Sequence, residues 1–434
     1  MNGLRSGAIV TVLFALAAAV LLSVLPFWLD DVLQLIGTSP PAGIAEVVRY
    51  VPQNPGGVPL GYLLQHGWLE LVGVSRLTAR APAFVFGVAS VWLVGLLARR
   101  LGLRSPWMAA ALFAVLPIVL RYTTEARPYS QAIFLSLASL FTGFQLMDRP
   151  GFWSAACHVL AITAAIYTQP FTLFVPLAQL LWQFWLGSRR SSWVTAAAVG
   201  AALILFLPWM AYARGGWSQT ITASQFQFVF TPKTPLMLLR ELTGAGYIGT
   251  VCLIAAAILS RNSTTMDREA KLLLVMISGL CFVGGLVADA AFGYFIAIRQ
   301  FLWALPPLAL LAAEGLASST RLTRVSLLAF LLGASAAASY RYFSNPREDW
   351  EAAAQAIEAR LGPGQCLQVI TPDQAIYYEF FRPGLAARRC SNSPRMVVAV
   401  TPYANTQAPA EPGYALTGER TVGGTRILLL ERRP

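Results

Sequence analysis

The sequence predicts an α-helical protein with many membrane spans, followed by a small α/β domain at the C-terminal end. Hydrophobic residues make up 56% of the 434 residues and charged residues only 12%, about half the charged share of an ordinary soluble domain. The mean hydropathy is +0.59. Apolar runs approaching the roughly 20 residues that cross a bilayer recur up to residue 340, and a more polar stretch follows. These observations exclude an ordinary soluble fold and a disordered chain.

About eleven segments are candidates for transmembrane helices. They lie near residues 8–28, 81–98, 106–120, 129–147, 152–168, 170–186, 193–213, 246–260, 271–290, 300–316 and 324–340. We expect the first segment to be an uncleaved anchor, because its apolar run is longer than that of a typical signal peptide.

The net charge of +12 indicates membrane orientation. If the N-terminus is cytoplasmic, the loops on that side hold twelve basic and four acidic residues, against nine and seven in the outer loops and eleven and nine in the tail. Lys and Arg concentrate in cytoplasmic loops. The sequence therefore predicts a cytoplasmic N-terminus and, with an odd number of spans, an extracytoplasmic tail. Membrane lipids are expected partners and nucleic acids are not.

This reading divides the chain into a membrane domain, residues 1–340, and an outer domain, residues 341–434. The membrane domain has two long outer loops, 29–80 and 214–245, and the second is either a mobile lid or an interfacial helix. In the tail, periodicity and turn residues predict helices and strands in an α/β order. The helices are expected at 349–361 and 373–381, and the strands at 366–370, 396–400 and 425–430.

Two of the five cysteines, Cys366 and Cys390, lie outside the predicted spans. An oxidising compartment permits them to form a disulfide, which would contribute roughly 3 kcal/mol in the chain-entropy model. Two buried free thiols are the alternative.

Acidic residues at the outer membrane face are the first candidates for chemistry. Asp30 and Asp31 directly follow the first apolar run, and Glu125 lies at the outer end of the third. The pair could simply cap a helix, and Glu125 could form a surface ion pair with Arg127. Charges at this depth are costly unless they are solvated, paired or used. Together they suit a general-base or metal-assisted site facing one compartment.

Several cationic residues lie at the same face. Arg299 stands at the mouth of a span, where it either snorkels to the headgroups or presents a fork to a phosphate. Arg76 and Lys233 are weaker candidates. His66, which follows a Gly- and Pro-rich turn, is expected mainly to anchor the chain at the interface with Trp68.

Six sequence motifs, taken in order, resemble the GT-C superfamily of membrane glycosyltransferases, especially bacterial relatives of protein O-mannosyltransferases and of the aminoarabinose transferase of lipid A. The motifs are Asp30-Asp31, Pro59-Leu60-Gly61-Tyr62, the segment from Gly73 to Phe84, the segment from Tyr122 to Tyr129, Ile298-Arg299 before Pro306-Pro307, and Asp349-Trp350 with Tyr377-Tyr378. Asp31 stands where Glu is commoner in the family, and Gln300 where Tyr is commoner.

The resemblance implies a GT-C fold and an enzyme that uses a sugar linked to polyprenyl phosphate at the outer face of a bacterial inner membrane. The acceptor would be a hydroxyl of an envelope lipid, glycan or protein. Asp30 would be the general base of a single inverting displacement. Asp31 and Glu125 would orient the acceptor, adjust the charge of Asp30, or hold a divalent cation (Mg, Mn or Zn) in which Asp30 and Glu125 are the ligands.

In the same resemblance, the departing lipid phosphate would meet cationic and phenolic side chains. The candidates are Arg127, Arg299 and Tyr129, with Arg76, Lys233 and His66 behind them. Two other classes remain open at this point. A transporter or flippase for a polar lipid would also have many spans, but no internal repeat halves this chain. A non-catalytic membrane scaffold would use the tail to bind an envelope partner.

Overall fold

The fold was examined in a computed structural model of the chain. The structure describes residues 2–54, 56–186, 189–223, 229–294, 296–345, 347–362, 365–385, 395–402 and 413–433. The chain divides into two compact units. The first combines Met1–Leu22 with Gly37–Arg341, and the second combines Ser23–Ile36 with Tyr342–Pro434.

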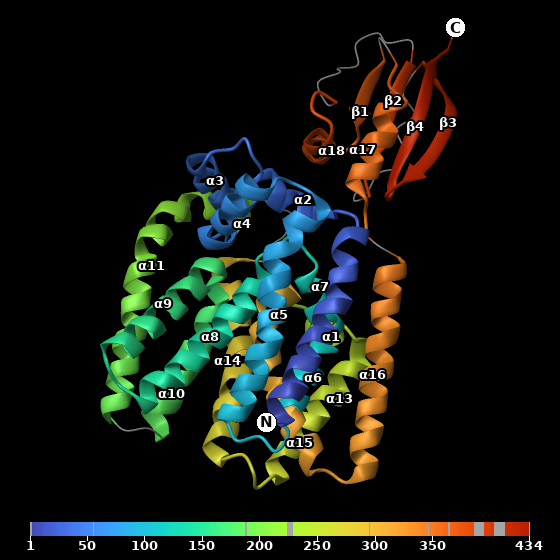
Figure 1. Ribbon diagram of the computed structural model, residues 1–434. Coiled ribbons are helices and arrows are strands. Elements are labelled where there is room, and N and C mark those ends of the chain that lie inside the picture. Colours follow the sequence, from blue (N-terminus) through green and yellow to red (C-terminus); the bar gives the residue numbers. More distant parts are fainter. Residues whose placement is uncertain are drawn as a thin grey trace. The chain divides into compact units, whose positions relative to one another are not determined.

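The first unit is helical (Figure 1). Its α-helices are α1 (Asn2–Val24, whose last two residues fall in the second unit), α3 (Ile44–Tyr50), α4 (Pro59–Val72), α5 (Arg76–Arg100), α6 (Pro106–Ala114), α7 (Pro117–Thr123), α8 (Tyr129–Asp148), α9 (Phe152–Thr168), α10 (Phe174–Leu186), α11 (Arg189–Ala223), α12 (Thr234–Glu241), α13 (Gly246–Leu259), α14 (Arg268–Phe292), α15 (Leu305–Ser318) and α16 (Arg321–Ser344, whose last three residues fall in the second unit). Short 3₁₀ turns join some of them, including η4 (Ile298–Gln300).

Each of the eleven segments expected to span the membrane is largely helical. Within the described residues, six helices are long and apolar enough to cross a membrane, and two further pairs meet the test as bent spans. The remaining apolar helices, Phe152–Thr168, Pro170–Leu186 and Leu302–Ser318, are shorter. By length and composition the described residues thus hold six to eight spans, and the three shorter apolar helices correspond to the remaining predicted segments, which fall short of about 20 residues.

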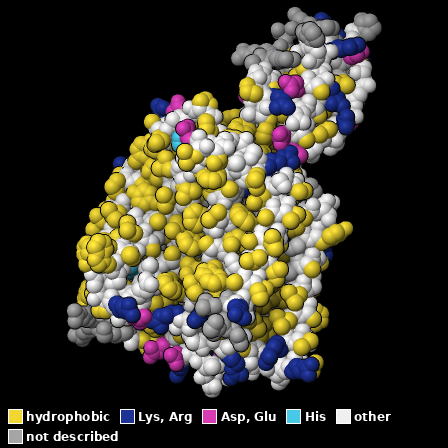
Figure 2. Space-filling model, in the orientation of Figure 1, with side chains coloured by type: hydrophobic (Ala, Val, Ile, Leu, Met, Phe, Trp, Pro, Cys, Tyr) yellow, Lys and Arg dark blue, Asp and Glu magenta, His cyan; other side chains and the backbone are white. Residues whose placement is uncertain are grey.

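The surface of the helical unit agrees with this architecture. Figure 2 shows a face that is largely hydrophobic, with Lys and Arg side chains gathered along its lower edge. Exposed apolar residues of the long helices include Ile9, Leu16, Val85 and Val283, each more than half exposed. Contiguous apolar surface of this kind is what a bilayer covers. The predicted fold class is therefore confirmed.

The third predicted span is broken in the middle. Helices α6 and α7 meet at an angle of 71°, and Leu116 between them has an extended backbone. Pro117 has no N–H to continue α6 and disfavours a helical residue before it. The backbone N–H of Ile118 donates to the carbonyl of Thr243 (3.2 Å). The break lets α7 start in a new direction and end at the Glu125 segment.

The part of the first predicted outer loop that belongs to the first unit, residues 37–80, is mostly helical. Ser75 caps α5 by accepting from the backbone N–H of Thr78 (3.1 Å), so this helix begins at Arg76, five residues before the predicted span. Arg80 is almost fully buried, and its guanidinium donates to the carbonyl of Leu22 (3.0 Å) near the end of α1. A cation at a helix C-terminus satisfies carbonyls that have no partner within the helix.

The second outer loop starts later than predicted. Residues 214–223 continue helix α11, which is 35 residues long. The indole N–H groups of Trp209 and Trp217 both donate to the carbonyl of Gly57 (3.2 and 3.0 Å), so this helix is fastened to the first outer loop. Phe226 and Phe228, which belong to the predicted loop 214–245, lie outside the described residues.

The second unit contains a four-stranded sheet in the order β1-β2-β4-β3. Its strands are β1 (Cys366–Val369), β2 (Arg395–Val400), β3 (Tyr414–Val422) and β4 (Thr425–Arg432), and its helices are α2 (Leu29–Ile36), α17 (Trp350–Glu358) and α18 (Ala375–Phe381). β1 and β2 are parallel, and β2–β4 and β3–β4 are antiparallel. The predicted helices and three of the strands are present. β3 was not predicted, because this edge strand is mostly exposed and lacks an alternating apolar pattern.

The N-terminal part of this unit was not expected. The predicted boundary at residues 340/341 agrees with the division at Arg341 and Tyr342, but Ser23–Ile36 also belongs to the C-terminal unit. Helix α2 packs against α18, and Phe27 stacks on Phe381 with ring centroids 6.1 Å apart. The Arg347 guanidinium lies 3.9 Å from the ring centroid of Trp28, a cation–π contact.

The cysteines divide as their positions suggest. Cys252 and Cys281 are buried free thiols and Cys157 is an exposed one. Cys366 is disulfide-bonded. Its predicted partner, Cys390, lies outside the described residues.

Candidate active site

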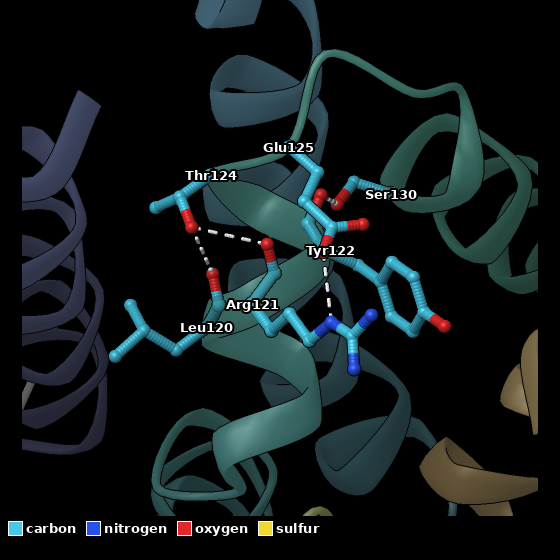
Figure 3. Close-up of polar contacts among 6 residues, drawn as sticks. All are labelled: Leu120, Arg121, Tyr122, Thr124, Glu125 and Ser130. Carbon is cyan, nitrogen blue, oxygen red and sulfur yellow. Dashed lines mark hydrogen bonds and ion pairs between the residues drawn. The ribbon is translucent and has the colours of Figure 1, made fainter. Parts of the chain in front are cut away.

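Glu125 is the centre of the polar cluster that joins α7 to α8. It is only 2% exposed, and one carboxylate oxygen accepts from Arg121 Nε at 2.7 Å (Figure 3). Glu125 is therefore not a surface group, and the ion pair that the structure shows is with Arg121. Helix α7 places Arg121 four residues before Glu125, the spacing at which side chains on a helix meet.

Tyrosine rings line the same turn. The rings of Tyr122 and Tyr129 meet edge to face at 4.8 Å, and Ser130 Oγ donates to the carbonyl of Tyr122 (2.8 Å). The guanidinium of Arg127 lies 5.6 Å from the centroid of the Tyr129 ring, and its Nη2 lies 3.4 Å from the Tyr129 hydroxyl. The residues of the Tyr122–Tyr129 motif therefore form one compact structure.

Arg299 joins this structure from a distant part of the sequence. It lies in η4, and its side chain hydrogen-bonds to the Tyr294 hydroxyl. Burial raises the pKa of Tyr294 to about 12, and the nearby charges of Arg299 and Arg127 act against that rise. Two guanidinium groups, from the α7–α8 turn and from the segment after α14, thus act on one hydroxyl. Arg299 also lies close enough for its charge to act on Tyr122.

The Pro59–Tyr62 motif packs against the turn between α7 and α8. Gly61 lies in the first turn of α4, and a Cβ on this residue would overlap the ring of Pro128. Tyr62 is 4% exposed and lies 6.3 Å, ring to ring, from Tyr50. The glycine is needed for the close approach of α4 to the turn that carries Glu125 and Arg127.

A Gly61→Ala substitution is expected to displace that turn, because the proline ring cannot rotate away. We expect kcat/KM to fall by about 10- to 100-fold, the order of loss that a displacement near 1 Å causes. Gly67→Ala is the matched control on the same helix, since a Cβ there meets nothing within 4 Å. Transfer assays and thermal unfolding of both variants check this. Equal activities of the two would show that the contact with Pro128 is unimportant.

The predicted acid pair belongs to the second unit. Asp30 and Asp31 occupy the first turn of α2, where negative charge is favoured by the helix dipole. Asp30 is partly buried and Asp31 completely buried. Tyr377 on α18 is near enough to Asp30 for the two to interact electrostatically. Burial, the charge of Asp30 and the charge of Asp373 raise the pKa of Tyr377 to about 12.

The Asp349-Trp350 and Tyr377-Tyr378 motifs of the C-terminal unit hold α18 in place. Asp349 caps α17 by accepting from the backbone N–H of Ala352 (3.0 Å). Trp350 is completely buried, with ring centroids 4.8 Å from Tyr377 and 5.2 Å from Tyr378. The Tyr378 hydroxyl hydrogen-bonds to Thr425 on β4 (2.9 Å). Asp349 therefore fixes the start of α17, Trp350 packs against α18, and Tyr378 joins α18 to β4.

Three weaker candidates take separate places. His66 is buried, with Nδ1 3.0 Å from the carbonyl of Thr38 and Nε2 3.9 Å from Glu70, which favours the structural interpretation. Arg76 is partly buried at the start of α5. Lys233 is exposed at the start of α12.

The surroundings of Glu125 do not fit a divalent cation. The Glu125 carboxylate is paired with the Arg121 guanidinium, and the guanidinium of Arg127 in the same turn would repel a divalent cation. Mg²⁺ and Mn²⁺ sites instead gather several oxygen ligands. Within the described ranges, no group of three or more His, Cys, Asp or Glu side chains is arranged to hold a metal. We therefore derive no step through a metal ion at Asp30 and Glu125.

An apolar pocket of about 530 Å³ lies among α12, α13, α14 and α15. Its lining includes Leu238 from α12, Leu242 directly after that helix, Ile254 from α13 and Phe282 from α14. The other lining side chains are likewise apolar apart from Ser278. A pocket of this composition accommodates a hydrocarbon chain.

Sequence reasoning missed two contributors to the cluster. Arg121 could have been found, because it is a basic residue only four positions before Glu125 in the sequence, close enough for the two side chains to pair. Tyr294 had no such signal, since it follows an apolar helix and lies far in sequence from Arg127 and Tyr129.

Residues 53–212, which include the Pro59–Tyr62 and Tyr122–Tyr129 motifs, match the family described as dolichyl-phosphate-mannose-protein mannosyltransferase. A comparison with curated proteins gives no match. The chain has the fold of the GT-C superfamily of membrane glycosyltransferases.

Among solved structures, the chain is similar to ArnT from Cupriavidus metallidurans. In the apo state the TM-score is 0.61 at 12% identity, with 98% of this chain and 97% of ArnT covered. ArnT bound to undecaprenyl phosphate gives a TM-score of 0.61 at 13% identity, with the same coverage of both chains. The oligosaccharyltransferase AglB from Archaeoglobus fulgidus, in complex with an inhibitory peptide and a dolichol-phosphate, gives 0.53 at 12% identity. That match covers 88% of this chain and 64% of AglB.

Proposed function

We propose that this protein is a membrane glycosyltransferase that moves a sugar from a polyprenyl-phosphate donor to a hydroxyl of an envelope lipid, glycan or protein. The reaction takes place at the outer face of a bacterial inner membrane, with the N-terminus in the cytoplasm and the C-terminal unit outside. The gathering of Lys and Arg along one edge of the helical unit supports this orientation.

The proposal rests on two guanidiniums held beside tyrosine hydroxyls: Arg127 Nη2 lies 3.4 Å from the Tyr129 hydroxyl, and Arg299 hydrogen-bonds to the Tyr294 hydroxyl. Two permanently charged guanidiniums held beside phenol hydroxyls form a site for a phosphate, because Arg binds phosphate through parallel hydrogen bonds. Tyr129, next to Arg127, completes the lining. The apolar pocket among α12–α15 supports a donor with a hydrocarbon tail.

The reaction that we propose is a single inverting displacement. The acceptor oxygen attacks the anomeric carbon while the bond from that carbon to the phosphate oxygen breaks. The acceptor proton passes to the carboxylate of Asp30, and the lipid phosphate leaves with the electron pair of the broken bond. Arg127 and Arg299 offset the negative charge that develops on this phosphate, which is usually the largest contribution to catalysis.

The remaining acids and bases have supporting roles in this proposal. Asp31 orients the acceptor or influences the charge state of Asp30, and Glu125 orients the acceptor. Glu125 does so while paired with Arg121, so that its own charge stays balanced. Arg76 and Lys233 steer the anionic donor toward the site, and His66 holds the first outer loop in shape.

Purified protein in vesicles tests this function. The vesicles contain sugar-loaded polyprenyl phosphates extracted from the host membrane and a lipid fraction as acceptor. We expect release of free polyprenyl phosphate together with a glycosylated acceptor, both detected by mass spectrometry. Movement of the intact donor between leaflets without cleavage would instead indicate a flippase. If neither transfer nor movement of the donor occurs, a non-catalytic scaffold is favoured. Comparing envelope glycans of a deletion strain with those of the parent strain identifies the acceptor.

A further inference from the structure

Asp289 is a buried carboxylate to which the mechanism above gives no role. It lies one turn before the end of α14 and is 0% exposed. Its Oδ1 accepts a hydrogen bond from Nε2 of Gln300 at 3.0 Å. Burying a carboxylate is costly, so a residue of this kind at the outer end of a span requires an explanation.

Gln300 connects this carboxylate to the segment around Arg299. The side-chain Oε1 of Gln300 accepts from the backbone N–H of Ala297 (2.7 Å), and its own backbone N–H donates to the carbonyl of Ala297 (3.0 Å). Gln300 is 1% exposed. Both ends of η4 are thereby held, and Arg299 is the residue between them.

The start of this segment is held by the same helix turn. The backbone N–H of Tyr294 donates to the carbonyl of Asp289 (2.8 Å), and Gly293 has a left-handed conformation that ends α14 (φ 65°). The Tyr294 side chain in turn bonds to Arg299. Asp289 therefore fixes the Arg299 segment at two points, through its backbone carbonyl and through its side chain.

We propose that Asp289 and Gln300 form a clamp that positions Arg299 for the phosphate of the lipid donor. This inference rests on the proposed function, in which Arg299 binds that phosphate. Asp289 is a positioning residue, which acts through Gln300 and does not touch the donor. Pre-organisation of this kind strengthens binding because less conformational freedom is lost when the ligand arrives.

The clamp makes a prediction about which atom of Asp289 matters. Asp289→Asn retains an Oδ1 that accepts from Gln300, whereas Asp289→Leu and Gln300→Leu both break the bond. The clamp thus depends on the acceptor oxygen and not on the negative charge. A role of Asp289 as a general charge near the arginines would make Asn as harmful as Leu.

Binding of undecaprenyl phosphate to the purified full-length protein is the direct test, because it requires no knowledge of the sugar. We expect Kd to rise about tenfold or more in Asp289→Leu and Gln300→Leu, and to stay within about threefold of the parent in Asp289→Asn. Cys281→Ala is the control for general weakening of α14, since this completely buried free thiol lies in the same helix and is not part of the lining of the apolar pocket. Thermal unfolding is measured for all variants.

Arg299→Leu separates the two levels of the argument. If Arg299→Leu weakens binding and both leucine variants of the clamp bind like the parent, the clamp is wrong and the proposed phosphate site stands. If Arg299→Leu binds undecaprenyl phosphate like the parent, the phosphate role of Arg299 and the clamp are both overturned. Gln300→Leu breaks the same hydrogen bond without changing any residue of α14. It therefore tests the clamp even when Asp289→Leu does not fold.

Discussion

Replacement of Asp30 by Asn is expected to lower kcat by about 100- to 10,000-fold, the range that a positioned general base contributes. Asn has nearly the same shape but cannot take the acceptor proton. The side chain is partly buried in the first turn of α2, so the fold should persist. The donor KM should change little, because Asp30 acts on the acceptor in this mechanism. Transfer rates at saturating donor, with expression and membrane insertion verified, measure the effect.

Asp373→Asn is the matched control. Asp373 is an exposed acid of the same unit, and its charge also acts on Tyr377. We expect this variant to transfer sugar at the parental rate. A near-parental rate in Asp30→Asn would refute the general-base role and direct attention to Asp31.

The second large effect is expected at the buried ion pair of Glu125 and Arg121. Glu125→Leu alone leaves the Arg121 guanidinium, 23% exposed, without the partner that it has at 2.7 Å. Loss of one member of a buried pair typically costs about 3–5 kcal/mol, and the partial exposure of Arg121 places the expected loss toward the lower end of that range. We expect reduced thermal stability and a loss of transfer activity of at least about 100-fold.

The double variant Arg121→Met with Glu125→Leu separates stability from function. Apolar replacement of a whole buried pair is often neutral or stabilising, so thermal unfolding should return to near the parental temperature. Activity should remain as low as in Glu125→Leu, because the proposed role of the carboxylate is in the site itself. Recovery of activity together with stability would mean that the pair only holds the α7–α8 turn in shape.

Much of the fold could be predicted from local patterns. Apolar length and the distribution of Arg predicted the membrane helices, and periodicity with turn residues predicted most of the tail. These signals are local, since a helix or buried strand leaves its period in consecutive residues. Strand β3 escaped for the same reason, because its exposed face and Gly418 break the pattern.

The site was predictable as a set of residues but not as an arrangement. Glu125, Arg127 and Tyr129 are neighbours in sequence, so their motif pointed to one place. The approach of Arg299 and Tyr294 to them depends on how α14 and η4 pack, which no spacing along the chain records. The same holds for Gly61, whose importance is the space that it leaves for Pro128.

The sequence by itself determined that this is a polytopic helical membrane protein with a small C-terminal α/β domain, because composition, apolar length and local periodicity follow directly from the residues. Only the tertiary structure decided that Ser23–Ile36, with Asp30 and Asp31, belongs to the C-terminal unit. It likewise decided that Glu125 is buried against Arg121 and that Asp289 holds the Arg299 segment through Gln300. These facts depend on contacts between distant segments, whose partners are chosen by packing and burial and not by local sequence.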